Sequence, residues 1–162
     1  MKKKRYDVFL IAGGTAGHVF PAKSLSDYLF TNGVSNLIVT DHRGLKYIKS
    51  NNNEIKKIQA SHLDSKNFKY FFSLIKIIIG FLQFIFLYIQ KKPKNIITFG
   101  GYVSFAPLLT TVLLRKIVNT NIYFHEQNSV IGNVHRKFLF SAKKIFLTFE
   151  HTKGIDEKYF KN

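Results

Sequence analysis

Residues 6 to 22 read YDVFLIAGGTAGHVFPA, and this stretch decides the fold. Its apolar beginning, Tyr6 to Ala12, is typical of a short strand that is buried on both faces of a parallel sheet. The strand ends at Gly13-Gly14, where the lack of a Cβ atom lets the backbone turn tightly and approach a ligand closely. From His18 to Asn32 apolar side chains recur at near-helical spacing, so a helix should follow the glycines.

The rest of the chain repeats this alternation. Short apolar strands are predicted at 37–40, 55–58, 95–99, 121–124 and 144–149, and helices at 45–49, 70–90, 105–118 and 133–141. Such alternation indicates an α/β fold with an open parallel sheet and flanking helices. A length of 162 residues fits one such domain and leaves no room for a second of equal size.

Composition narrows the class of partner. Lys and Arg total 25 against 9 acidic residues, which gives a net charge of +16 and favours a nucleic acid, an anionic membrane or a phosphorylated substrate. Because the basic residues are spread along the chain without a nucleic-acid-binding signature, we expect no nucleic-acid partner. The chain has no cysteine, which excludes disulfides and thiolate metal sites. The apolar run after Arg5 is too short for a signal peptide.

Three polar clusters follow predicted strands: 13–18 (GGTAGH), 100–104 (GGYVS) and 125–128 (HEQN). Ligands of open parallel sheets gather at the carboxyl ends of the strands, so the three clusters are expected to share one rim. The first cluster opens a helix, whose free N–H groups and dipole suit phosphate. It matches neither a Walker loop nor a dinucleotide fingerprint. Asp41, after the second strand, is either a ribose-binding acid or, more commonly, a turn residue.

His18 stands at the predicted helix start. A neutral imidazole there can take a proton from an attacking hydroxyl, and the helix dipole would lower its pKa and keep it unprotonated. The alternative is a histidine that only caps or packs.

The second and third clusters have similar alternatives. Tyr102 and Ser104 offer hydroxyls beside paired glycines, or Ser104 merely caps the next helix. A row of polar residues from His125 to Asn128 packs poorly and favours ligand contact, although a helix-start turn is also possible. No further ligand spacing supports a metal site at His125 and Glu126, so we expect no metal.

Taken together and in this order, GGTAGHVFPA (13–22), GGYVS (100–104) and HEQN (125–128) resemble the undecaprenyl-diphospho-muramoylpentapeptide N-acetylglucosaminyltransferase (MurG) family. The resemblance implies the Rossmann-like N-terminal half of a GT-B glycosyltransferase. That family transfers GlcNAc from UDP-GlcNAc to lipid I with inversion, giving lipid II, and needs no dinucleotide cofactor. Its N-terminal domain receives lipid I at the cytoplasmic face of the bacterial inner membrane, as a peripheral protein.

Positions that match the family motifs receive its roles. His18 would be the catalytic base, and Glu126 a second candidate or the residue that orients the base. Two departures bear on the loops: Ala16 replaces a frequent Gly, and Pro107 follows Ser104 by three residues rather than two. The implied substrate-binding residues are Gly14, Thr15, Ala16, Gly17, Gly101, Tyr102, Ser104, His125, Gln127 and Asn128.

The resemblance ends near Phe149, before the family's donor-binding domain. We therefore expect residues 1–162 to form the acceptor-binding domain without the C-terminal domain that holds most of the UDP-GlcNAc site, and to transfer little alone. The alternative is a non-catalytic membrane-recruiting subunit of a split glycosyltransferase.

The segment Tyr70 to Ile89 is apolar and long enough to cross a bilayer. However, Ser73, Lys76, Gly80 and Gln83 mark one narrow polar seam, and the next strand must rejoin the same sheet. We interpret the segment as a peripheral amphipathic helix, against the alternative of a core helix. Membrane contact is predicted for Phe81, Phe84, Ile85, Lys91 and Lys92, with Lys66, Lys69 and Lys94 also near anionic head groups.

Overall fold

The computed structural model describes residues 5–48, 54–62, 69–156 and 159. Its centre is a six-stranded sheet in the order β3-β2-β1-β4-β5-β6, with every neighbouring pair parallel. The strands are β1 (Val8–Ile11), β2 (Asn36–Thr40), β3 (Ile55–Lys57), β4 (Asn95–Thr98), β5 (Asn121–Glu126) and β6 (Lys144–Leu147). This order reverses direction between β1 and β4, as in doubly wound folds, so the predicted fold class is confirmed.

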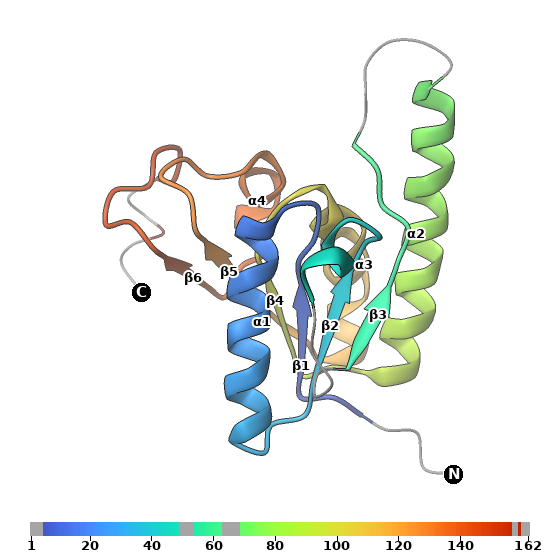
Figure 1. The fold of residues 1–162 in the computed structure, drawn as a ribbon, viewed down its shortest axis with the longest axis horizontal. Helices are drawn as coiled ribbons and strands as arrows, with labels where there is room; N and C mark the ends of the chain where they lie inside the picture. The colour runs from blue at the N-terminus through green and yellow to red at the C-terminus, as the bar shows by residue number, and fades with distance from the viewer. Residues whose placement is uncertain (1–4, 49–53, 63–68, 157–158, 160–162) are drawn as a thin grey trace.

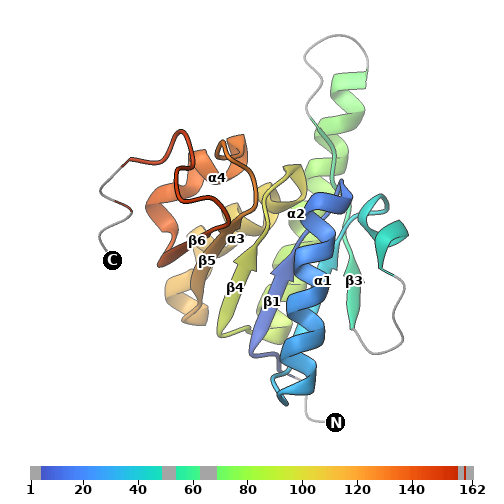
Figure 2. The same ribbon diagram turned by 60° about the vertical axis from the view of Figure 1, so that its left-hand side comes forward.

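Helices cover both faces of the sheet (Figures 1 and 2). On one face α1 (Ala16–Thr31) buries Val19 against Leu10 of β1, and on the other α2 (Lys69–Lys91) buries Phe84 against Phe9 of β1. Side chains that alternate along β1 therefore serve two separate cores, which explains why this strand is apolar without interruption. The remaining helices are α3 (Phe105–Val118), α4 (Asn133–Phe138) and the 3-10 turns η1 (Gly44–Tyr47), η2 (Tyr102–Ser104) and η3 (Leu139–Ser141).

Helix α2 has the length and hydropathy of a membrane span, at 22 residues and a mean hydropathy of 2.2 for Tyr70–Lys91. Its neighbours in sequence, β3 and β4, belong to the same sheet, and the helix packs along that sheet beside α3. Figure 1 shows its N-terminal end projecting past the carboxyl ends of the strands. The helix therefore lies against the domain, as an amphipathic helix does.

One residue predicted to contact the membrane, Phe84, is buried in the core instead. Its ring is fully buried between Phe9 and Tyr88, with ring centroids 6.3 and 5.9 Å away, so it faces the sheet and the predicted membrane contact is wrong for this residue. Phe81 and Ile85 are half-buried, Lys91 lies 5.8 Å from the centre of the Tyr6 ring, and Lys92 is exposed. Lys66 and the side chain of Lys69 lie outside the described residues.

Three residues of the polar seam of α2 contact the chain that follows β3. Gly80 lies so close to the chain after β3 that a Cβ atom there would fall 1.8 Å from the Gln59 carbonyl oxygen. Gln83 accepts a 2.7 Å hydrogen bond from the Gln59 N–H, and Ser73 contacts Ser61 at 3.1 Å. The seam thus satisfies the backbone that follows an edge strand; Ser73 and Gly80 are buried, whereas Lys76 and Gln83 remain exposed.

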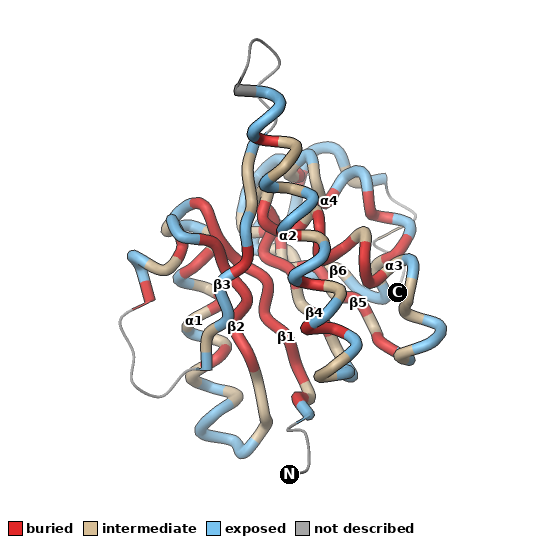
Figure 3. The backbone as a smooth tube through the Cα atoms, turned by 90° about the vertical axis from the view of Figure 1, so that its right-hand side faces the viewer, coloured by how far each residue is buried: buried red, intermediate tan, exposed pale blue. Residues whose placement is uncertain are grey.

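Consequently, large apolar side chains point outward from α2. Figure 3 shows a run of exposed turns along this helix. We call the exposed set the outer stripe of α2; its members are Tyr70, Phe71, Phe72, Ile78, Ile79, Leu82, Phe86 and Ile89, each at least 41% exposed. So many neighbouring exposed apolar side chains are unusual on a water-facing surface and mark a surface that meets a partner or a membrane.

Candidate functional site

The three predicted loops meet at the carboxyl edge of the sheet, and Asp41 joins two of them. Its Oδ1 atom accepts hydrogen bonds from the N–H groups of Gly14 (3.0 Å) and Gly44 (2.8 Å). Its Oδ2 atom accepts a 2.6 Å hydrogen bond from the Tyr102 hydroxyl. Asp41 is fully buried by this packing, so its carboxylate is occupied in shaping loops, as the turn alternative predicted.

The charge of Asp41 is stabilised by those donors. Burial alone would raise the pKa of this carboxyl, but the hydrogen bonds from Tyr102, Gly14 and Gly44 outweigh burial and lower it. The same arrangement raises the pKa of Tyr102 to about 12, through burial first and then through the hydrogen bond and charge of Asp41. Both groups therefore keep the protonation states that the bond requires at neutral pH.

Close approach explains the glycines of the first loop. A Cβ atom at Gly13 would lie 2.7 Å from both Asp41 Oδ1 and a Val103 methyl group, which leaves no room for a side chain. Gly14 has a φ of +80°, and a Cβ atom there would lie 3.1 Å from the Tyr102 ring. The Tyr102 ring thus packs directly on the first loop.

His18 lies where the first two loops meet. Its Nδ1 atom is 2.7 Å from Thr15 Oγ1, and a Cβ atom at Gly100 would lie 3.5 Å from its Nε2 atom. Burial lowers its pKa below the ordinary value of 6.5, which the charge of Glu126 partly offsets. The imidazole is therefore neutral at pH 7 and able to accept a proton.

Glu126 is the centre of a buried hydrogen-bond network. Its Oε1 atom accepts from the backbone N–H (3.1 Å) and the side-chain amide (2.8 Å) of Asn128. Its Oε2 atom accepts from the Gly132 N–H and lies 3.0 Å from His135 Nδ1, while His135 Nε2 lies 2.8 Å from Thr98 Oγ1. Each carboxylate oxygen of Glu126 therefore has two hydrogen-bond partners.

This network determines the charge of Glu126. Burial would raise its pKa, but the hydrogen bonds from His135, Gly132 and Asn128, together with the nearby imidazole, lower it to about 2. A carboxylate that is 1% exposed and so acidic is a poor proton acceptor. Its geometry fits a residue that shapes the third loop and acts on His18 through its charge.

Two polar atoms of the third cluster lack a partner. His125 Nδ1 and Gln127 Oε1 are buried without a hydrogen-bond partner among the described residues. The Gln127 amide is held from its other side, because Nε2 donates to the Phe99 carbonyl at 3.0 Å. Leaving such atoms unpaired costs about 1–3 kcal/mol each, so they are natural partners for a ligand.

Ser104 was predicted to contact substrate, but its side chain does not point to the rim. Its side chain is fully buried and donates a 2.8 Å hydrogen bond to the Gly100 carbonyl, so it shapes the second loop from below and does not line the rim. It also makes no side-chain cap for α3. Thr15, Gly17 and Asn128, by contrast, are exposed at the rim, and Ala16 begins α1 with no acidic residue in its first turn.

The sequence reasoning missed His135 and Thr98. His135 is fully buried and stacks on Phe124, with ring centroids 4.4 Å apart. In the sequence it is one polar residue in a short helix, and nothing there marks it as facing inward.

Comparison with known proteins identifies the family of this chain. Residues 8–147 match the glycosyltransferase family 28 N-terminal domain. The chain belongs to glycosyltransferase family 28. The matched residues include all three loops of the candidate site.

Family 28 relatives agree with the motif resemblance. The chain is 38% identical over 151 residues to the UDP-N-acetylglucosamine--N-acetylmuramyl-(pentapeptide) pyrophosphoryl-undecaprenol N-acetylglucosamine transferase of Rickettsia typhi, covering 93% of this chain and 37% of that protein. The enzyme of the same name from Wolbachia pipientis wMel is 38% identical over 149 residues, covering 91% and 40%. The chain therefore spans about two fifths of the length of these relatives.

Solved structures agree as well. Acinetobacter baumannii MurG superimposes with a TM-score of 0.73 at 27% identity, over 90% of this chain and 42% of that one. A Rickettsia africae glycosyltransferase, at 15% identity and a TM-score of 0.61 over 96% of this chain and 41% of that one, shares the fold. The MurG-family resemblance of the three motifs is confirmed.

Proposed function

We propose that this chain is the acceptor-binding half of an inverting glycosyltransferase that transfers GlcNAc from UDP-GlcNAc to lipid I, forming lipid II for peptidoglycan. The observation that supports it most is the position of a neutral His18 between two glycine loops, beside the start of α1. A donor domain supplied by the rest of such an enzyme would close over this rim.

The start of α1 is suited to the acceptor's diphosphate. Thr15, Ala16 and Gly17 lead into a helix of 16 residues, whose positive dipole end points at the rim. Gly17 has open space around its Cα atom, so a phosphate can approach the backbone closely. The exposed Asn128 and the unpaired His125 and Gln127 atoms then serve the sugars.

His18 acts as the base in this proposal. When Nδ1 is protonated, its N–H donates a hydrogen bond to Thr15 Oγ1, and the unprotonated Nε2 can accept the proton of the muramoyl 4-hydroxyl. The oxygen then attacks C1 of GlcNAc as the bond to UDP breaks, which inverts that carbon. Glu126 contributes a fixed negative charge that favours the imidazolium formed in this step.

A lipid-linked acceptor requires a membrane surface nearby. The outer stripe of α2 supplies apolar side chains, and Lys76 and Lys92 are exposed on and just after this helix. A peripheral position on the anionic cytoplasmic face of the inner membrane follows, with α2 lying in the head-group region.

The test is transfer to lipid I by this chain supplied with a matching C-terminal donor half. His18→Ala should reduce transfer at least about 100-fold while lipid I binding persists, the size typical of a lost general base. A non-catalytic recruiting subunit would tolerate the substitution, and full activity of the variant would therefore refute the proposal.

A further inference from the structure

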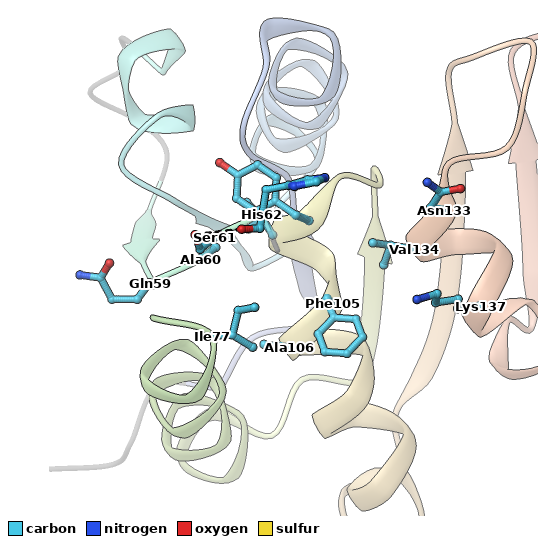
Figure 4. A pocket seen from close by; sticks show the side chains of 12 residues that line it. Gln59, Ala60, Ser61, His62, Ile77, Phe105, Ala106, Asn133, Val134 and Lys137 are labelled. Atoms are coloured by element: carbon cyan, nitrogen blue, oxygen red, sulfur yellow. Dashed lines mark hydrogen bonds between the residues drawn. The ribbon is translucent and has the colours of Figure 1, made fainter. Parts of the chain in front are cut away.

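A separate cavity of about 240 Å³ opens beside the candidate site. Figure 4 shows that its side chains come from α2, from the segment after β3, from the start of α3 and from α4. We call it the α2–α4 pocket. Nothing in the transfer chemistry described above uses it.

The wall of this pocket is apolar. Ile77 of α2, Phe105 and Ala106 of α3 and Val134 of α4 contribute its hydrophobic surface. Ile77 adjoins Ile78 of the outer stripe, so the pocket and the stripe are successive apolar surfaces on one helix. An apolar ligand in the pocket would therefore have the outer stripe on the same helix nearby.

Polar and cationic side chains also line the pocket. Tyr102 lines it, and the same ring packs on Gly14 of the first loop, so the pocket begins where the phosphate-suited rim ends. Lys137 of α4 also lines it, and no Asp or Glu does so within the described part of the chain. A ligand with an anionic head joined to an apolar chain fits this combination of side chains.

We infer that the α2–α4 pocket binds the first isoprenoid units of the acceptor's polyprenyl chain and directs the chain from the glycine rim to the outer stripe of α2. The inference rests on the proposed function, because it takes the acceptor to be a polyprenyl diphosphate. The pocket would then set the distance between the membrane and the reacting sugar, because a polyprenyl chain bound there places its diphosphate beside Tyr102 and the first loop.

The test compares two soluble probes by calorimetry with the full chain, in the absence of detergent: geranylgeranyl diphosphate below its micelle concentration, and inorganic diphosphate. We expect the isoprenoid probe to bind at least about tenfold more tightly, because each buried methylene strengthens binding about fourfold. Val134→Phe and Ile77→Phe fill the pocket from two helices and should each reduce that advantage to less than about threefold, with inorganic diphosphate binding unchanged. Ile79→Phe makes the same chemical change on the outer stripe and should leave both affinities unchanged.

Each outcome distinguishes the pocket from the proposed function. Equal affinity for the two probes, or an isoprenoid advantage that survives in both filled variants, overturns the pocket assignment even if lipid I is bound and glycosylated. An isoprenoid advantage that both filled variants remove supports the pocket even if no sugar transfer is found. Circular dichroism of each variant confirms that the fold is intact, and two independent variants keep the test valid if one of them unfolds.

Discussion

Tyr102 donates a 2.6 Å hydrogen bond to Asp41, and this bond joins the second glycine loop to the first. The residues come from opposite sides of β1, since Asp41 follows β2 and Tyr102 follows β4. Asp41 also holds Gly14 and Gly44, so one buried carboxylate fixes the shape of the rim around His18.

Removing that bond should loosen the rim. Tyr102→Phe should lower the free energy of unfolding by about 1.5 kcal/mol, because the lost hydrogen bond is made to a charged acceptor. Urea unfolding measures the change. Tyr123→Phe is the matched control, since the Tyr123 hydroxyl makes no hydrogen bond within the described residues, and it should change stability by less than about 0.5 kcal/mol. Equal effects of the two substitutions would contradict the role assigned to the bond.

Glu126 should make the free energy of unfolding depend on pH under acidic conditions. Its pKa is about 2 in the folded chain against 4.5 ordinarily, so its stabilisation is complete above pH 4.5 and is lost as the pH falls towards 2. The shift corresponds to a contribution on the order of 3 kcal/mol at neutral pH. Glu126→Gln should therefore be less stable at pH 7, and its deficit relative to the wild type should shrink between pH 5 and pH 3. A deficit that stays constant over this range would show that the carboxylate charge is not involved.

The pH dependence of transfer tests the state of His18. Because burial lowers the pKa of His18 below 6.5, transfer that uses His18 as the proposed base, with a donor half supplied, should decline only at a pH below 6.5, where the imidazole becomes protonated. Removing the charge of Glu126 takes away the influence that raises this pKa, so Glu126→Gln should shift the acid limb of kcat/KM to still lower pH. A shift of that limb to higher pH would contradict the electrostatic link between the two residues.

The outer stripe of α2 predicts membrane binding by named side chains. Phe86→Ser should weaken co-sedimentation with anionic vesicles about tenfold, because the exposed Phe86 ring would otherwise be buried in lipid. Phe140→Ser, on an equally exposed ring that follows α4, should have no effect.

Phe84→Ser separates stability from membrane contact. The Phe84 ring is part of the core, so this substitution should cost about 3–5 kcal/mol of folding stability. Vesicle binding that is lost with a fully stable Phe84→Ser protein would contradict the orientation of α2.

The sequence was sufficient for the elements and for the shared rim. Strands and helices were predicted because apolar periodicity and glycine loops are local signals, and parallel pairing then brings the loops to one edge of the sheet. This explains why the sequence alone predicts that His18, Tyr102 and Asn128 lie at one edge of the sheet.

Side-chain direction was harder to predict, because it is set by tertiary packing. Ser104 was predicted to face the ligand but faces the Gly100 carbonyl, and Phe84 was predicted to face lipid but faces β1. His135 gave no signal at all, since its partners Glu126 and Thr98 lie on strands 9 and 37 residues away in sequence. Only the folded chain shows which polar residues lie beneath the rim.

The proposed acceptor binding is tested most directly by measuring the binding of lipid I to the chain in detergent micelles, with UDP-GlcNAc titrated as a separate ligand. Saturable binding of lipid I, with little or no binding of UDP-GlcNAc, is the predicted result for an acceptor domain without its donor half. Failure of the folded chain to bind lipid I would contradict the proposed function.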